Sequence, residues 1–283
     1  MTLKELFEKG KTTLKDITYE YETDAWLLLE RVTGCTRFQY LTYPDTEIGS
    51  DKCDEYMAML AKRVRHIPLQ HIIGSQEFMG LEFKVNEHVL IPRQDTECLV
   101  EEAIRQLGKV NSNCEADAKV LDMCTGSGCI IISIAKNVQL KKAVAVDISK
   151  EALDVARVNA LYNEADICFV QSNLFENVED EKYDMIVSNP PYIESEVIEG
   201  LMPEVKEHEP RIALDGGEDG LIFYRKIIED AKQYLVSGGY LIFEIGHNQR
   251  EAVCNLFCEN GYVDVKAMKD LAGLDRVCMA RLA

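Results

Sequence analysis

The 283-residue sequence lacks any run of uninterrupted apolar residues long enough to cross a membrane, which takes about 18. Its amphipathic, charged N-terminus also lacks a signal-peptide core, so we expect a cytoplasmic protein without a membrane partner. No two cysteines are spaced as Cys-x-x-Cys, and the ten cysteines and five histidines are dispersed. Cys129, Cys168 and Cys278 lie in apolar contexts. We therefore expect reduced, mostly buried thiols and no metal site.

The sequence also lacks an excess of positive charge. Lys and Arg number 31 against 49 Asp and Glu, which gives a net charge of −18. Such a chain repels a phosphate backbone unless a local basic patch overrides the field, so we expect no direct nucleic-acid partner. The charge suits a basic protein partner, or simply keeps the chain soluble. With 47% apolar and 28% charged residues, the chain has ample material for a medium-sized domain and a small one.

Residues 1–70 favour a helical domain. Apolar residues recur at helical spacing near residues 3–7, 25–32 and 51–64, with a break before Leu14. This part has no glycine-rich loop or catalytic cluster, so it is typical of a small recognition or packing domain. Residues 71–92 alternate around two glycines and predict a β-hairpin linker.

Residues 93–283 favour one α/β domain with a Rossmann-like sheet. It starts with a predicted helix at 98–107 and a polar loop at Lys109–Ala118. Strands and helices then alternate, which predicts a mostly parallel sheet covered by helices on both faces. Seven strands are predicted, near residues 120–124, 143–147, 167–170, 183–187, 240–245, 263–268 and 276–282.

A turn after the first of these strands predicts a small-molecule site. Only Gly126 and Gly128 match a dinucleotide fingerprint, which needs a third glycine. Asp122 would repel a pyrophosphate but suits a cationic ligand. Asp147 ends the next strand and could accept from two ribose hydroxyls, and Asn173 follows the third strand, where it could pair with an adenine amine. S-adenosylmethionine combines a cationic amino-acid end, a ribose and no phosphate, so we expect it as the cofactor.

The stretch Asn189-Pro190-Pro191-Tyr192 follows the fourth strand. Two prolines remove two N–H donors and stiffen the backbone, which leaves a corner rich in acceptors. The Asn189 side-chain oxygen and the Pro190 carbonyl could bind the two hydrogens of a planar –NH2 group, while Tyr192 packs against its plane. Polar residues at this edge of a parallel sheet commonly bind ligands. We therefore interpret Asn189, Pro190 and Tyr192 as catalytic.

Several stretches together resemble the HemK/PrmC type of release factor glutamine methyltransferases, within the class I S-adenosylmethionine-dependent methyltransferases. The resemblance covers nearly the whole chain. The stretches that carry it are Ile91–Glu97, the Asp122–Gly128 turn, Asn189–Tyr192, Glu209-Pro210-Arg211, Leu214–Gly217, Glu244-Ile245-Gly246, Asp270–Gly273 and Asp275-Arg276-Val277.

The resemblance implies transfer of a methyl group from S-adenosylmethionine to a glutamine side-chain amide, with S-adenosylhomocysteine as product. The acceptor would be the glutamine of the Gly-Gly-Gln loop of a peptide chain release factor, and the helical domain would contact that protein. We expect a monomer. The substrate would contact Asn189, Pro190, Pro191 and Tyr192. The expected cofactor contacts are Asp122, Cys124, Thr125, Gly126, Gly128, Asp147, Asn173, Leu174 and Asn189.

Three residues depart from the family pattern. Gln94 replaces a usual proline, Cys124 a usual glycine and Asn173 a common aspartate. Arg93 and Glu97 either pair structurally beneath the site or contact the substrate.

Three other functions fit the same residues. A glutamine methyltransferase of a ribosomal protein shares the site chemistry. An adenine-N6 methyltransferase also handles an –NH2 group, but the negative charge and the lack of a basic, aromatic-rich segment disfavour it. The third alternative is a non-catalytic cofactor-binding module. The intact Asn-Pro-Pro-Tyr stretch disfavours it, because such a module would not need that stretch.

Overall fold

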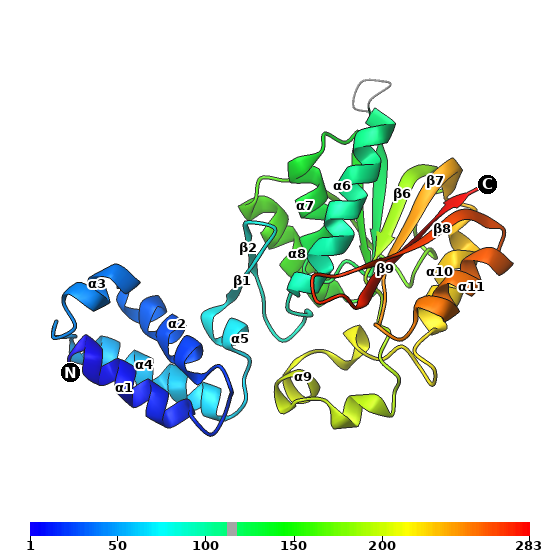
Figure 1. Cartoon of the computed structure of the whole chain (residues 1–283). Coiled ribbons are helices and arrows are strands. Elements are labelled where there is room, and N and C mark those ends of the chain that lie inside the picture. The colour runs from blue at the N-terminus through cyan, green and yellow to red at the C-terminus, as the bar shows by residue number, and fades with distance from the viewer. Residues whose placement is uncertain (112–117) are drawn as a thin grey trace. The chain divides into compact units, whose positions relative to one another are not determined.

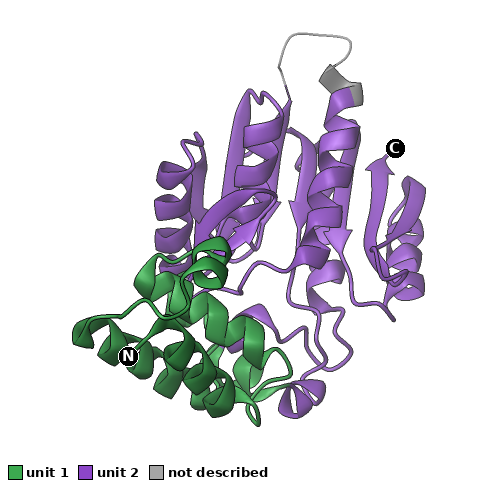
Figure 2. Cartoon of the chain, turned by 60° about the vertical axis from the view of Figure 1, so that its left-hand side comes forward, with its two compact units in different colours: residues 1–75, 202–208 green, residues 76–201, 209–283 purple. Residues whose placement is uncertain are grey.

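The chain forms two compact units in the computed structural model, which describes residues 1–111 and 118–283. Figure 2 colours the first unit green and the second purple. The first unit combines Met1–Ser75 with Met202–His208, and the second combines Gln76–Leu201 with Glu209–Ala283. Residues 202–208, which the sequence assigned to the larger domain, therefore group with the N-terminal helices.

The first unit is helical (Figure 1), and its three longest helices turn their apolar faces inward. Leu6, Leu28 and Tyr56 are fully buried in its core. Its first helix is continuous where the sequence predicted a break, and α3 was not predicted. The helices are α1 (Leu3–Leu14), α2 (Tyr21–Thr33), α3 (Arg37–Thr42), α4 (Ser50–Val64), α5 (Leu69–Ile73) and α9 (Pro203–His208).

A buried ion cluster joins three segments of the first unit. The Arg63 side chain is 3% exposed, and its Nε lies 2.6 Å from Asp24 Oδ2. Its Nη2 lies 2.5 Å from Glu204 Oε1. A guanidinium buried in this way must be paired, because an unpaired buried charge is strongly destabilising. The Glu204 contact thus joins the 202–208 segment to α2 and α4.

A short hairpin begins the second unit. Its strands are β1 (Ser75–Phe78) and β2 (Leu81–Lys84), and Met79 and Gly80 form the turn with positive φ angles of 51° and 72°. The sequence predicted a hairpin within 71–92, but residues 69–73 are helical.

A seven-stranded sheet forms the centre of the second unit, in the order β5-β4-β3-β6-β7-β9-β8. Its first four pairings are parallel, while β9 runs antiparallel to both of its neighbours. The predicted Rossmann-like, mostly parallel seven-stranded sheet is therefore confirmed. The strands are β3 (Lys119–Met123), β4 (Lys142–Asp147), β5 (Cys168–Gln171), β6 (Tyr183–Ser188), β7 (Leu235–Glu244), β8 (Tyr262–Lys269) and β9 (Asp275–Leu282).

Helices cover both faces of this sheet. The helices α6 (Glu97–Asn111), α7 (Cys129–Asn137) and α8 (Lys150–Tyr162) pack on one face. The helices α10 (Ile222–Ala231) and α11 (Arg250–Glu259) pack on the other (Figure 1). Alternate residues of each central strand enter the two cores, as a strand requires.

Two expectations about these segments need correction. Helix α6 extends to Asn111, so residues 109–111 are helical rather than part of the predicted loop, and the rest of that prediction falls outside the described residues. Cys168 is exposed rather than buried, because β5 is an edge strand of the sheet. No helix within residues 1–111 or 118–283 is long and apolar enough to cross a membrane.

Candidate functional site

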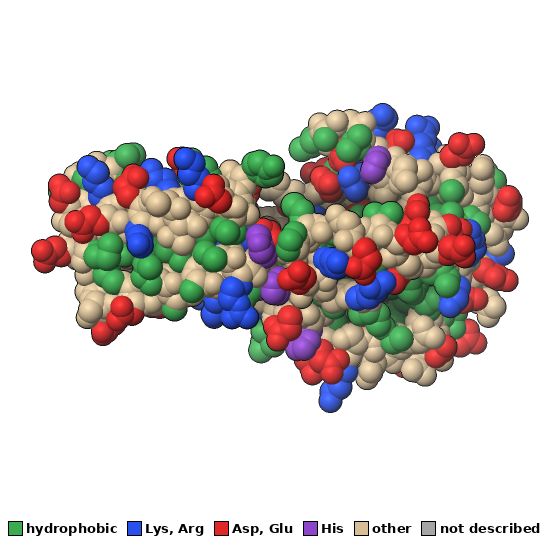
Figure 3. Space-filling model, turned by 90° about the horizontal axis from the view of Figure 1, so that it is seen from below, with side chains coloured by type: hydrophobic (Ala, Val, Ile, Leu, Met, Phe, Trp, Pro, Cys, Tyr) green, Lys and Arg blue, Asp and Glu red, His purple; other side chains and the backbone are tan. Residues whose placement is uncertain are grey.

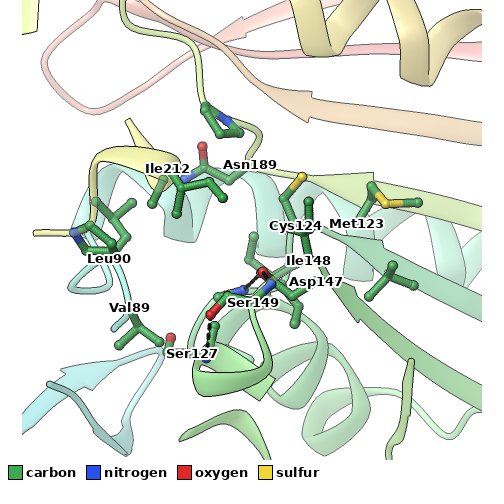
Figure 4. A pocket seen from close by; sticks show the side chains of 18 of the residues that line it. Val89, Leu90, Met123, Cys124, Ser127, Asp147, Ile148, Ser149, Asn189 and Ile212 are labelled. Carbon is green, nitrogen blue, oxygen red and sulfur yellow. Dashed lines mark hydrogen bonds between the residues drawn. The ribbon is translucent and has the colours of Figure 1, made fainter. Parts of the chain in front are cut away.

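A pocket of about 240 Å³ lies in the second unit, where the parallel strands end. The segments that follow β3, β4, β5 and β6 all contribute to its wall, since the carboxyl ends of parallel strands meet at one edge. Figure 4 shows Asn189 and Ile212 across the pocket from Ser127 and Ser149, with Val89 and Leu90 on a third side.

The pocket collects most of the residues expected from the sequence. Those in its wall are Cys124, Thr125, Gly126, Asp147, Asn173, Leu174, Asn189 and Pro191. Four others are not in the wall, namely Asp122, Gly128, Pro190 and Tyr192. Gly128 acts through packing instead: its φ is +81°, and a Cβ there would lie only 3.2 Å from Ala156 Cβ.

The turn after β3 is held against the end of β4. The Gly126 N–H donates to Asp147 Oδ2 at 2.9 Å, and the Thr125 N–H donates to the Val146 carbonyl at 2.9 Å. Cys124 adopts a φ of +62°, a left-handed conformation that favours glycine. A glycine at this position would adopt the same conformation without strain.

Asp147 keeps acceptor capacity towards the pocket. Its Oδ2 accepts from Gly126, and its Oδ1 accepts from the Ser149 N–H at 2.9 Å. Burial raises the pKa of the carboxyl, although these backbone donors lower it. Each carboxylate oxygen can accept a second bond, so Asp147 can still bind two hydroxyl groups.

Asp122 lies beneath the turn, fully buried at the end of β3. Its Oδ2 accepts from the Thr125 hydroxyl at 2.6 Å, whereas its Oδ1 has no hydrogen-bond partner among the described residues. Burial raises the pKa of this carboxyl to about 7. A cation placed above the turn would stabilise the ionised form.

Asn173 and Asn189 each donate one hydrogen bond through the side-chain nitrogen. Asn173 Nδ2 donates to Glu176 Oε1 at 2.7 Å, and Asn189 Nδ2 donates to Thr96 Oγ1 at 3.4 Å. Within residues 1–111 and 118–283, the Asn189 oxygen accepts no hydrogen bond. It is thus an open acceptor at the edge of the pocket.

Tyr192 lies beneath the pocket wall. Its hydroxyl donates to Glu244 Oε1 at 3.3 Å, and its main-chain carbonyl accepts from Gln249 Nε2 at 2.9 Å. Gly216 packs so tightly here that a Cβ would lie 2.7 Å from Tyr192 Cα. The main chain and the hydroxyl of Tyr192 are therefore both held in place.

Arg93 and Glu97 do not pair with each other. Arg93 Nη2 instead lies 2.6 Å from the buried Glu209 Oε2, and Arg93 itself lines the pocket. Glu97 Oε1 accepts from the Met79 N–H at 2.7 Å and so fixes the hairpin turn. A structural pair between the two was one of the two expectations, but each side chain instead contacts a residue that is distant in the sequence.

Several pocket residues were not found by sequence reasoning. They include Thr96, Ile148, Ser149, Ile212, Phe223 and Lys226. Two of them, Ile148 and Ser149, directly follow Asp147, so their place after β4 was a usable signal. Nothing local distinguishes Phe223 or Lys226, which reach the pocket from α10.

Asn159 joins the turn to the hairpin. Fully buried in α8, it donates to the Ser127 carbonyl at 2.9 Å and the Lys84 carbonyl at 3.0 Å, and accepts from the Lys84 N–H at 2.6 Å.

Asn159→Ala should therefore lower the free energy of unfolding by about 2 kcal/mol, since three backbone groups lose their partner. Denaturant unfolding measures this. The control Asn137→Ala removes one bond from an exposed residue to the Ser133 carbonyl; equal losses in the two variants would contradict the expectation.

Both units match known domains. Residues 5–74 match the PrmC N-terminal domain, and residues 104–205 match the methyltransferase small domain. A release factor glutamine methyltransferase of Geobacter sulfurreducens is 41% identical over 277 residues, covering 98% of this chain and 93% of that protein. Another, of Clostridium botulinum, is 40% identical over 286 residues and covers 99% of both chains.

A solved structure supports the fold alone. It is the 16S rRNA N2 G1207 methyltransferase of T. thermophilus, in complex with AdoMet and guanosine. It aligns with a TM-score of 0.52 at 16% identity, over 74% of this chain and 50% of that chain.

The sheet, the pocket at its carboxyl edge and the matched catalytic domain together define a methyltransferase. Both domain matches and the two full-length relatives narrow this class further. The chain belongs to the family of release factor glutamine methyltransferases, which confirms the resemblance seen in the sequence.

Proposed function

We propose that this chain transfers a methyl group from S-adenosylmethionine to the side-chain amide nitrogen of the glutamine in the Gly-Gly-Gln loop of peptide chain release factors. The observation that carries this proposal is the 41% identity, over 98% of the chain, to a release factor glutamine methyltransferase. The open acceptor of Asn189 at the pocket edge supplies matching chemistry.

The pocket residues fit S-adenosylmethionine. Asp122 lies outside the pocket wall, but it has a buried oxygen without a partner among the described residues, and a carboxylate beneath the turn suits the positive charge of the amino-acid end above it. Asp147 would accept from the ribose hydroxyls, and the Asn173 oxygen would accept from the adenine amine. When bound, the cofactor supplies a methyl group activated by a positively charged sulfur.

Asn189 would hold the acceptor amide in line for transfer. An amide nitrogen is a poor nucleophile, because its lone pair is shared with the carbonyl. The Asn189 oxygen and the Pro190 carbonyl would accept its two N–H bonds and fix its orientation. Such positioning and preorganised electrostatics supply several kcal/mol in enzymes. The nitrogen loses one proton as it gains the methyl group, and that proton passes to solvent because Asn189 is a weak base.

The surface charge fits a protein substrate better than a nucleic acid. On the face in Figure 3, acidic side chains spread over the second unit among the basic ones. With a net charge of −18, this surface does not favour a phosphate backbone.

Labelled S-adenosylmethionine tests the substrate directly. The enzyme is incubated separately with a release factor, with the same factor carrying Glu in place of the Gly-Gly-Gln glutamine, with ribosomal proteins and with DNA. We expect label only on the intact release factor. Label on ribosomal protein or on DNA alone, or equal label on the Glu variant, would overturn the proposal.

A further inference from the structure

The side chain of Gln249 is buried next to the Asn189–Tyr192 corner and has no role in the function proposed above. It is 7% exposed and lies outside the pocket wall. Its Nε2 donates to the Tyr192 carbonyl at 2.9 Å and to the Gly220 carbonyl at 3.2 Å. Its Oε1 accepts from the Gly246 N–H at 3.0 Å. One amide therefore joins the segments that follow β6, precede α10 and follow β7.

Two of the residues that contact this amide are glycines, and neither has room for a side chain. A Cβ on Gly220 would lie 2.6 Å from Gln249 Nε2 and 2.4 Å from the Tyr192 carbonyl oxygen. A Cβ on Gly246 would lie 2.9 Å from Gln249 Oε1. Any larger residue at these positions would have to displace the amide or the main chain. The junction is thus built closely around the Gln249 amide.

Gln249 stands at a position where the local structure favours other residues. It is the N-cap of α11, where Ser, Thr, Asp and Asn are preferred because their side chains accept from the first turn of a helix. Within the described residues, the Gln249 side chain makes no such bond. Its main chain is itself fixed, since the Gln249 N–H donates to the Gly246 carbonyl at 2.9 Å. A residue that breaks a local preference commonly serves a function elsewhere in the fold.

The corner has few main-chain groups that can hold it in place. Pro190 and Pro191 have no N–H groups to donate. The Tyr192 carbonyl follows them directly, and Gln249 holds it at 2.9 Å. Because the two prolines stiffen the backbone between Asn189 and Tyr192, a fixed Tyr192 carbonyl also limits where Asn189 can lie.

We propose that Gln249 is a positioning residue for methyl transfer, which fixes the Asn189–Tyr192 corner by holding the Tyr192 carbonyl. This inference rests on the proposed function, in which the Asn189 oxygen and the Pro190 carbonyl orient the acceptor amide. Those oxygens must keep the acceptor nitrogen in line with the methyl donor, and a displacement of about 1 Å costs about 100-fold in rate. Gln249 acts on them through the main chain rather than by contact with the substrate.

Gln249→Met keeps the approximate size of the side chain and removes the hydrogen bonds of its amide. It should lower kcat about 30-fold, because the Tyr192 carbonyl is released and the corner moves. The Kd for S-adenosylmethionine should stay within about twofold of the wild-type value, since Gln249 lies outside the pocket wall. Single-turnover kinetics with a release factor and calorimetry with the cofactor measure these two quantities.

Gly220→Ala disturbs the same junction while Gln249 stays intact. The added methyl group would meet both the Tyr192 carbonyl oxygen and Gln249 Nε2, so we expect a similar fall in kcat. Gly261→Ala is the matched control. Its φ of 80° strains an alanine as the 69° of Gly220 does, but among the described residues nothing lies within 4 Å of the added Cβ. It should keep the wild-type kcat.

Tyr262→Phe separates positioning from general stability. The Tyr262 hydroxyl donates to the Ile228 carbonyl at 2.9 Å within the same core, so the variant should melt lower but keep the wild-type kcat. In an Asn189→Ala background, Gln249→Met should cost only about fivefold, because the main group that it positions is absent. An equal loss in both backgrounds, or a wild-type kcat in Gln249→Met, would overturn the inference.

A measurement that needs no substrate keeps this inference separable from the proposed function. The Ile193 N–H, which directly follows Tyr192, donates to the Leu214 carbonyl at 3.0 Å. In Gln249→Met this amide should exchange its hydrogen at least about 10-fold faster, whereas amides of β3 and β4 should exchange as in the wild type. Wild-type exchange at Ile193 in this variant would overturn the role of Gln249, whatever substrate the enzyme methylates.

Discussion

Asn189→Ala should lower kcat by at least about 100-fold, the effect of removing one preorganised group from a catalytic site. The reason is geometric: alanine has no oxygen to accept an amide N–H, so the acceptor nitrogen is no longer held in line with the methyl donor. S-adenosylmethionine affinity should change far less. Single-turnover kinetics with a release factor and calorimetry with the cofactor measure the two quantities separately.

The control for this experiment is Asn137→Ala, at the end of α7, where the side chain donates to the Ser133 carbonyl. It should keep normal turnover. If Asn189→Ala kept both its turnover and its cofactor Kd, the assignment of Asn189 would be wrong.

Asp147→Ala should instead raise the Kd for S-adenosylmethionine by about 100-fold, from two lost hydrogen bonds to a charged group. Part of this loss of affinity comes from a less ordered pocket wall, because the Gly126 and Ser149 N–H groups also lose their acceptor. At saturating cofactor, kcat should stay close to the wild-type value, since Asp147 would contact the ribose rather than the reacting atoms.

Asp154→Ala is the matched control, because Asp154 is an exposed residue of α8 that pairs with Arg157 at 2.9 Å. Its cofactor Kd should equal that of the wild type. Normal affinity in Asp147→Ala would remove that residue from the ribose role.

The central strands could be predicted because the buried residues of each strand are neighbours in the sequence. β3, β4 and β6 are nearly continuous apolar runs, as strands covered on both faces must be. Helix α3 was missed for the opposite reason: Phe38 and Leu41 are 77% and 76% exposed, so their apolar character signals no buried face. The start of β7 at Leu235 was hidden by Gly238 and Gly239, which are typical of a turn.

The pocket also contains residues that the sequence predicted and contacts that it could not predict. Asp147 ends one parallel strand and Asn189 directly follows another, so topology alone brings them to one edge. The link between Thr96 and Asn189 spans 93 residues, and no periodic pattern encodes it. The Arg93–Glu209 pair was missed in the same way, because Glu97 offered a nearer acidic partner in the sequence.

The 202–208 segment makes the architecture discontinuous in sequence. The chain leaves the larger unit after Leu201, contributes α9 to the helical unit, and returns at Glu209. A chimaera that exchanges only residues 1–75 would therefore bring in a foreign helical body while retaining a native Glu204 without its Arg63 partner. We propose that the helical unit contacts the release factor, and its substrate preference should then be transferable only when both pieces of chain are exchanged together.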